Sequence, residues 1–432
     1  MTAVLAATVF VVTYALIATE QVHRVTAALA GAAAMVLIGV VNAQSAFFSE
    51  ETGVDWNVVF LLLGMMIIVG ILRQTGLFEY LAIWTVKRAG GRPFRIMASL
   101  VVVTAFASAL LDNVTTVLLV APVTVLICER LGLRAVPFLL AEVLASNIGG
   151  TATLIGDPPN IILGSRAGLS FNDFVVNLGP LVILLTGVFV LLCRVMFRSA
   201  FTIDPARAAA MTGLDERAEI RDPRLLGQGL LVLALTMAGF VLHTALHVDP
   251  SIVALLGAGL LVLVSRVGID VPLREVEWPT LVFFMGLFVV VGGLIEAGVI
   301  DGLADAAGAA TGGDLFRGSM LLIGVSALLS GIVDNIPYVA TMSPVVAQLV
   351  GDAAESSADP TVLWWSLALG ADLGGNLTAV GASANVVMLG IADRSGHRIS
   401  FWQFTRYGAV TTAVTIALTV PYVWLRYFVL GW

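Results

Sequence analysis

The chain has 432 residues, of which 59% are hydrophobic and 12% are charged, and its formal net charge at pH 7 is -7. Soluble domains carry about a quarter charged residues, so this composition excludes an ordinary water-soluble protein and predicts an all-α integral membrane protein. The two cysteines, Cys128 and Cys193, exclude a disulfide framework, and no Cys/His cluster has the spacing of a zinc or haem site, so we expect no cofactor.

Apolar stretches long enough to cross a hydrocarbon core of about 30 Å recur along the first half of the chain. No Lys or Arg precedes the first stretch, so we expect it to be a retained span and not a cleaved signal. The predicted spans of this half cover residues 2–19, 25–41, 56–72, 136–165 and 174–197.

Residues 94–127 are too long for one span and too short for two, and Asp112 and Asn113 lie in their middle. We therefore predict a re-entrant hairpin, which enters the bilayer and returns to the same side. Residues 87–95 hold four basic side chains, and Arg130 and Arg134 follow the hairpin. Basic residues favour the cytoplasm, so both ends of this hairpin are predicted to be cytoplasmic.

A polar stretch, residues 199–224, joins this half to the next. The second half predicts spans over residues 225–243, 251–266, 278–295, 363–391 and 405–427, with a hairpin at 315–350. Its hairpin has acidic flanks, with Asp301, Asp305, Asp314, Asp352, Glu355 and Asp359, so we expect external ends. The linker carries Arg198, Arg207, Arg217, Arg221 and Arg224, which predict a cytoplasmic position.

The two halves repeat each other. Trp56, Gly64 and Gly70 recur 222 residues later as Trp278, Gly286 and Gly292, and Asp112-Asn113 recurs as Asp334-Asn335. "SNIGGTATLIGDPPN" from Ser146 matches "ADLGGNLTAVGASAN" from Ala371 at an offset of 225. Five spans in each copy, residues 1–198 and 225–432, make the second copy inverted, with the N-terminus outside. Inverted repeats with broken helices are the layout of secondary transporters, whose sites lie near the midplane.

Polar residues interrupt the spans at corresponding places in both halves. Glycine pairs are poor helix interiors, and Pro158-Pro159 opposes continuation of a helix, so both spans 136–165 and 363–391 are predicted to be broken at mid-membrane. A buried charge in a bilayer costs at least a few kcal/mol, which makes such residues functional candidates. The candidate ion- or substrate-binding residues are Asp112, Asn113, Thr115, Asn147, Gly149, Gly150, Thr151, Asp157, Asn160, Asp334, Asn335, Asp372, Gly374, Gly375, Asn376 and Asn385.

Several alternatives stay open at this point. Asp112 and Asp334 could cap helices, the glycines could serve close packing, and Glu142 is either a proton site or a residue near the interface. No Lys or Arg lies deep in a predicted span, which favours cations, protons or a neutral hydroxylated solute. An intramembrane aspartyl protease, with two aspartates sharing a proton, and a channel are the other classes considered.

The stretches "LLDNVTTVLLVAPVTVL" and "LASNIGGTATLIGDPPNIILGS" resemble the ion transporter superfamily, most closely the branch of arsenite permeases and the melanosomal P protein. The chain is also similar, more distantly, to the divalent anion/sodium symporters, whose hairpin tips carry Ser-Asn-Thr. The resemblance implies one cation site at Asp112, Asn113, Gly149, Gly150, Thr151 and Asn160. It implies a second site at Asp334, Asn335, Gly374, Gly375, Asn376 and Asn385.

The resemblance implies a transporter and not an enzyme. An Asp in place of Ser at each tip suits proton coupling and an uncharged metalloid better than a dicarboxylate. We therefore expect a proton-coupled secondary transporter for a small inorganic solute such as arsenite or antimonite. Sodium/proton antiport or sodium-coupled anion symport, with Na⁺ at the hairpin tips, is the alternative. The expected setting is the lipid bilayer of the cell membrane, as a homodimer and without nucleic acid.

Overall fold

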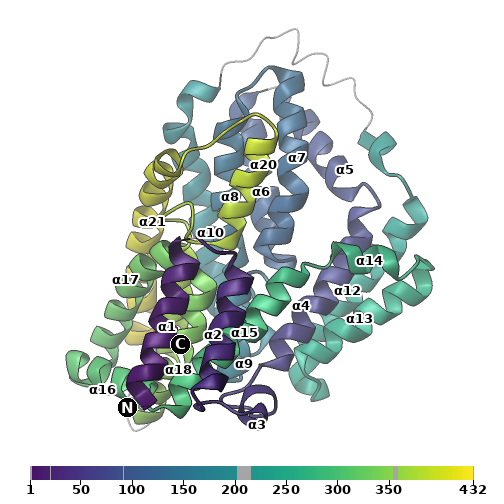
Figure 1. The fold of residues 1–432 in the computed structure, drawn as a ribbon. Helices are drawn as coiled ribbons and strands as arrows, with labels where there is room; N and C mark the ends of the chain where they lie inside the picture. The colour runs from purple at the N-terminus through teal and green to yellow at the C-terminus, as the bar shows by residue number, and fades with distance from the viewer. Residues whose placement is uncertain (1, 20, 91, 202–215, 354–358, 432) are drawn as a thin grey trace.

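A computed structural model describes residues 2–19, 21–90, 92–201, 216–353 and 359–431, and every regular element within these ranges is helical (Figure 1). The predicted all-α class is thereby confirmed. Within the described ranges, nine helices are long and apolar enough to cross a bilayer. Arg207 and Glu355, two of the residues used above to assign sides, lie outside the described residues.

The first half is a succession of helices, and the side chain of the preceding residue caps several of them. Asp55 Oδ1, for example, accepts hydrogen bonds from the backbone N–H of Asn57 at 3.1 Å and of Val58 at 3.3 Å. The helices are α1 Thr2–Thr19, α2 Arg24–Leu37, α3 Ala43–Phe47, α4 Trp56–Arg73, α5 Leu77–Arg88, α6 Pro93–Leu110, α7 Asn113–Leu131, α8 Ala135–Gly150, α9 Pro158–Ala167 and α10 Phe171–Met196.

The second half follows the same order of long and short helices. They are α12 Pro223–Leu246, α13 Pro250–Ser265, α14 Asp270–Glu275, α15 Trp278–Glu296, α16 Val299–Thr311, α17 Leu315–Val333, α18 Asn335–Asp352, α19 Val362–Gly374, α20 Ser383–Arg394 and α21 Phe401–Val423, which continues into a π-helical turn over Trp424–Val429. Each predicted hairpin corresponds to two helices with a short break, and each predicted broken span to a separate pair of helices.

Two features differ from the sequence-based expectation. The span predicted over 25–41 is the 14-residue helix α2, which ends at Leu37, since Gly39 adopts a left-handed φ of 73°. A helix of that length rises only about 21 Å, less than the thickness of a bilayer core. The short helices α5 and α16 were not predicted at all, because they carry charged side chains and are too short to span.

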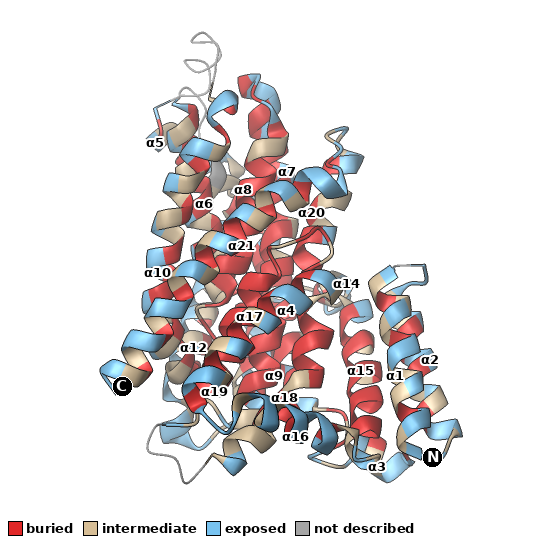
Figure 2. Ribbon diagram, turned by 90° about the vertical axis from the view of Figure 1, so that its left-hand side faces the viewer, coloured by how far each residue is buried: buried red, intermediate tan, exposed pale blue. Residues whose placement is uncertain are grey.

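Glycines allow two central helices, α4 and α15, to pack closely against their neighbours α13 and α2. A Cβ on Gly64 of α4 would lie 2.7 Å from the carbonyl carbon of Ala254 on α13, and one on Gly286 of α15 would lie 3.0 Å from that of Ala28 on α2. Buried residues are concentrated in such central helices as α4 and α15 (Figure 2). The outer helix α10 instead exposes apolar side chains such as Ile183 and Val195, as a lipid-facing helix does.

The two halves interlock through their short helices. Helix α9 of the first half packs against α18 of the second, and α20 of the second half packs against α7 of the first. Figure 1 shows α20 beside α7 in the upper part of the molecule and α9 near α18 in the lower part. Each break between two helices is therefore brought against the tip of a helix pair from the other half.

Candidate ion and substrate site

The aspartates at the tips of the two helix pairs cap the helices that follow them. Asp112 Oδ1 accepts a hydrogen bond from the backbone N–H of Thr115 at 2.8 Å, and the Thr115 hydroxyl donates to Asp112 Oδ2. Asp334 Oδ1 accepts from the backbone N–H of Ile336 at 3.0 Å, and Asp334 has an unusual positive φ of 106°. Capping is thus one role of both aspartates, and Thr115 is engaged with Asp112.

The glycine pairs at the ends of α8 and α19 serve close packing. A Cβ on Gly149 would lie 2.1 Å from the Ala105 carbonyl oxygen of α6, and one on Gly374 would lie 2.6 Å from Cα of Ala327 on α17. The carbonyl oxygen of Gly375 accepts from Asn385 Nδ2 at 2.8 Å, and that of Gly150 accepts from Asn160 Nδ2 at 3.4 Å. These glycines hold the breaks in place beside the tips of the helix pairs.

Asp157, which precedes α9, joins the tips of both helix pairs. Its Oδ2 accepts from Asn113 Nδ2 at 2.8 Å, and its two oxygens lie 3.3 Å from Asn335 Nδ2. All three side chains are buried. One carboxylate of the first half therefore contacts the asparagine that follows each tip aspartate.

Asn147 of α8 extends this cluster across the two halves. Its Oδ1 accepts from Asn113 Nδ2 at 3.1 Å, and its own Nδ2 donates to Asn376 Oδ1 at 2.9 Å and to Asn385 Oδ1 at 3.0 Å. Asn376 Nδ2 in turn donates to the carbonyl oxygen of Leu144 at 3.2 Å. Such a connected and buried polar network fixes the relative position of its members.

Asp372 of α19 lies beside this network but has a different environment. It is fully buried, and Thr151 and Asn160 lie next to its carboxyl group. Among the residues that the structure describes, neither carboxyl oxygen of Asp372 has a hydrogen-bond partner, and neither does Asn160 Oδ1. A buried carboxylate without a donor is costly, so this position is chemically incomplete without a proton or a bound cation.

The sixteen candidate residues thus fall into four groups. Asn113, Asn147, Asp157, Asn335, Asn376 and Asn385 share one hydrogen-bond network, and Thr151, Asn160 and Asp372 adjoin it. Asp112, Thr115 and Asp334 remain at the tips, with the four glycines at the breaks. The hydrogen bonds also connect the two halves, because Asn335 bonds to Asp157 and Asn147 bonds to Asn376 and Asn385. The division into one cation site for each half stays a prediction.

Arg24 is a charged residue at the site that sequence reasoning missed. Its guanidinium donates to the Ser383 hydroxyl and to Thr280 Oγ1 at 3.4 Å, and lies 4.0 Å from Asp334 Oδ2. The Ser383 hydroxyl donates to the same Asp334 oxygen at 3.1 Å. Arg24 immediately precedes the span predicted over residues 25–41, yet its side chain reaches one of the two tip aspartates. No local pattern in the sequence signals this contact, because it depends on how α2 packs against α15.

A cavity of about 330 Å³ lies at this arginine. It is lined by Ile17, His23, Arg24, Asp334, Ser383 and Val387, among others. A small solute in this cavity would lie next to Asp334, at one tip, and Ser383, the first residue of α20.

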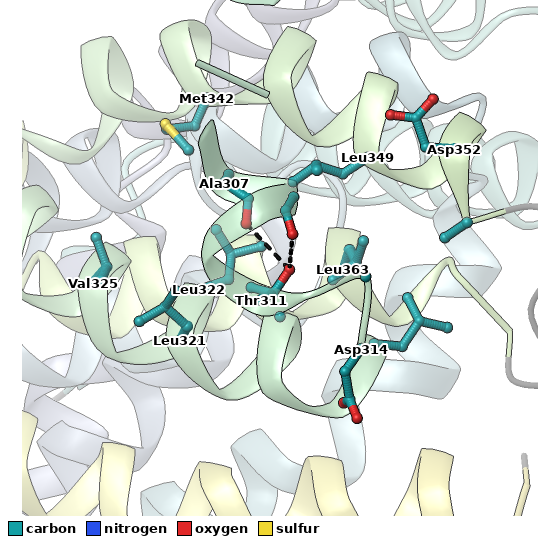
Figure 3. A pocket seen from close by; sticks show the side chains of 15 residues that line it. Ala307, Thr311, Asp314, Leu321, Leu322, Val325, Met342, Leu349, Asp352 and Leu363 are labelled. Atoms are coloured by element: carbon teal, nitrogen blue, oxygen red, sulfur yellow. Dashed lines mark hydrogen bonds between the residues drawn. The ribbon is translucent and has the colours of Figure 1, made fainter. Parts of the chain in front are cut away.

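A second cavity, of about 220 Å³, has a different character (Figure 3). It lies between α16, α17, α18 and α19 and is lined mainly by apolar side chains such as Leu322 and Leu349. The hydroxyl of Thr311 there donates to the carbonyl oxygens of Ala307 and Gly308 of its own helix, each at 3.1 Å. No member of the polar network lines this cavity, so it is a poor candidate for the site.

Glu142 of α8 is buried and contacts a neighbouring helix. The Thr124 hydroxyl of α7 donates to Glu142 Oε1 at 2.6 Å, while Oε2 has no partner among the described residues. Glu142 is therefore removed from solvent, and its two interpretations, a proton site or a residue near the interface, stay predictions. In the same described part of the chain, no group of three or more His, Cys, Asp or Glu side chains is placed to hold a metal ion.

Comparison with known proteins gives consistent results. Residues 14–370 match a protein family described as "Citrate transporter". An uncharacterized transporter of Mycobacterium tuberculosis is 57% identical over 99% of both chains. The P protein of Mus musculus is 33% identical over 97% of this chain and 60% of its own length, which confirms the predicted relationship to the P protein. The crystal structure of the YdaH transporter of Alcanivorax borkumensis shares the fold, with a TM-score of 0.59 at 16% identity, over 86% of this chain and 85% of that one.

Proposed function

Because the chain belongs to the citrate transporter family, we propose that it is a secondary active transporter coupled to a cation gradient, with protons as the coupling ion. The observation that carries this proposal is the position of Asp157, which bonds to Asn113 and Asn335 at the tips of both helix pairs. A proton that binds or leaves this carboxylate would change the contacts of both halves together. Such a link between charge and conformation is what coupled transport requires.

For the substrate, we favour a small carboxylate-bearing anion. Arg24 brings a guanidinium to the cavity beside Asp334, and the family description names citrate. Guanidinium groups bind carboxylates through paired, charge-assisted hydrogen bonds. The presence of Arg24 also removes the reason for preferring an uncharged solute.

Arsenite or antimonite remains the second candidate. The amide and carboxyl side chains of Asn113, Asn147 and Asp157 both donate and accept hydrogen bonds, as a small hydroxylated metalloid would require. Sodium-coupled symport or sodium/proton antiport would use the same residues with a different ion. A homodimer in the cell membrane, proposed on the resemblance to the divalent anion/sodium symporters, completes this assignment.

The test is uptake into proteoliposomes under an imposed pH gradient, an imposed sodium gradient or neither, with citrate, arsenite and antimonite as substrates. We expect accumulation of one substrate with the pH gradient, and its loss in Asp157→Asn, because the amide cannot release a proton. Asp301→Asn, on the exposed face of α16, is the matched control. Accumulation by Asp157→Asn equal to that of the unmodified protein would contradict the proposed role of Asp157.

A further inference from the structure

The environment of Asp372 can be compared with that of an equivalent residue in the first half. At the offset of 225, Asp372 corresponds to Asn147, and Asn376 and Asn385 correspond to Thr151 and Asn160. The hydrogen bonds agree with this correspondence. Asn385 Nδ2 donates to the carbonyl oxygens of Gly375 and Thr378, and Asn160 Nδ2 donates to those of Gly150 and Thr153, their equivalents.

In the first half the position holds an amide, which supplies hydrogen atoms. Asn147 Nδ2 donates to Asn376 Oδ1 and to Asn385 Oδ1, at 2.9 and 3.0 Å. In the second half the position holds Asp372, and the side chains beside it are Thr151 and Asn160, the equivalents of those two acceptors. Asp372, as a carboxylate, has no hydrogen to donate at the position where Asn147 donates to two side chains.

The side chains next to Asp372 donate their hydrogen atoms to other acceptors. The Asn160 amide donates its hydrogens to the Thr153 and Gly150 carbonyl oxygens, at 3.1 and 3.4 Å. The Thr151 hydroxyl donates to the Asn147 carbonyl oxygen at 2.9 Å. The two carboxyl oxygens of Asp372 and Asn160 Oδ1 are therefore buried acceptors without a donor among the described residues, and an uncharged Asp372 needs one additional hydrogen.

The negative charges near Asp372 also favour binding of a proton. Asp157, at the start of α9, and beyond it Asp334, at the start of α18, are carboxylates. The other charged side chains on helices packed against α19 either bond elsewhere, as Glu142 does with Thr124 and Arg426 with Asn177, or are exposed. None of the described residues supplies a cation to Asp372, so the missing positive charge must come from outside the protein.

We propose that Asp372, Asn160 and Thr151 form a binding site for one proton, which bonds to Asp372 and is donated to Asn160 Oδ1. The bound proton then takes the place that an amide hydrogen of Asn147 occupies in the first half. Release of the proton leaves a buried charge without a donor at Asp372 and weakens the interface between α19 and the break after α8. The site rests on the proposed function, and it adds Asp372 to Asp157 as a second buried carboxylate that binds a proton.

Difference infrared spectroscopy of the purified protein tests the site without any substrate. We expect the C=O band of protonated carboxylic acids to weaken as the pH rises, and we expect this loss to be smaller in Asp372→Asn. Asp301→Asn should show the full loss. An equal loss in Asp372→Asn and the unmodified protein would overturn the proposal, and so would a sodium-induced thermal stabilisation that depends on Asp372.

Thermal unfolding provides a second measurement. Asp372→Asn restores an amide at the position, so its melting temperature should not fall below that of the unmodified protein and should depend less on pH. The reciprocal variant Asn147→Asp should be destabilised at high pH, because it removes the donor to Asn376 and Asn385. Equal pH dependence in Asp372→Asn and the unmodified protein would contradict the site. Neither measurement involves transport, so failure of the transport assay alone would count against the proposed function only.

Discussion

At the scale of single residues, the polar centre departs from the symmetry of the repeat. Asp112 and Asp334 are equivalent at the tips, but Asp157 corresponds to Ala382, and Asp372 corresponds to Asn147. Each half therefore supplies one buried carboxylate at its broken helix, in a position where the other half has a neutral residue. The two carboxylates therefore have different environments. Asp157 accepts hydrogen bonds from two asparagines, whereas Asp372 accepts none from the described residues.

Arg24 allows the two substrate classes to be separated. We expect Arg24→Gln to raise the KM for a carboxylate anion about tenfold, because a hydrogen bond to a charged group is worth about 1.5 kcal/mol or more. Arg24→Lys should restore part of the affinity, and transport of uncharged arsenite should be unaffected. Initial rates of uptake over a range of substrate concentrations measure the effect, with the exposed Arg317→Gln as control. An unchanged KM for every anion tested would exclude Arg24 from the substrate site.

At the scale of the elements, glycine determines how closely α8 approaches α6 and how closely α19 approaches α17. The added methyl group of Gly149→Ala would meet the backbone of Ala105, which cannot move without displacing α6. We expect Gly149→Ala and Gly374→Ala each to destabilise the protein by about 1–3 kcal/mol, as overpacking does. Gly259→Ala on α13, where nothing lies within 4 Å, is the matched control and should be neutral or stabilising. Thermal unfolding in detergent measures these differences, and equal melting temperatures in all three variants would refute the packing role.

These elements also show what the sequence can predict. The breaks after Gly150 and Gly374 were predictable, because Gly pairs and Pro158-Pro159 act locally on the backbone. The position of Arg24 was not predictable, since it depends on how α2 packs against α15 and where α20 begins. Likewise, composition and spacing identify Asn147 and Asn385 as polar residues in broken helices, but their bond across the halves is a tertiary contact that no local pattern encodes.

At the scale of the whole molecule, the helices of the second half repeat the starting points of the first. Helices begin at Trp56, Leu77, Pro93 and Asn113, and others begin 222 residues later at Trp278, Val299, Leu315 and Asn335. Figure 1 shows the pair α6 and α7 in the upper part of the molecule and α17 and α18 in the lower part. This arrangement fits helix pairs that enter from opposite sides and meet at Asp157.

The basic residues predict an orientation for the whole molecule, which can be tested by labelling. Lys and Arg near the ends of α6 and α7 favour the cytoplasm, so we expect Arg130→Cys to be inaccessible to a membrane-impermeant maleimide in intact cells. Glu50→Cys, in the loop after α3, and Asp305→Cys on α16 should be labelled, since Figure 1 places both helices at the opposite end of the molecule from the end of α7. The three positions are exposed, whereas the native Cys128 and Cys193 are buried and can be replaced by Ala to remove background. Labelling of Arg130→Cys alone would contradict this orientation and indicate the reverse one.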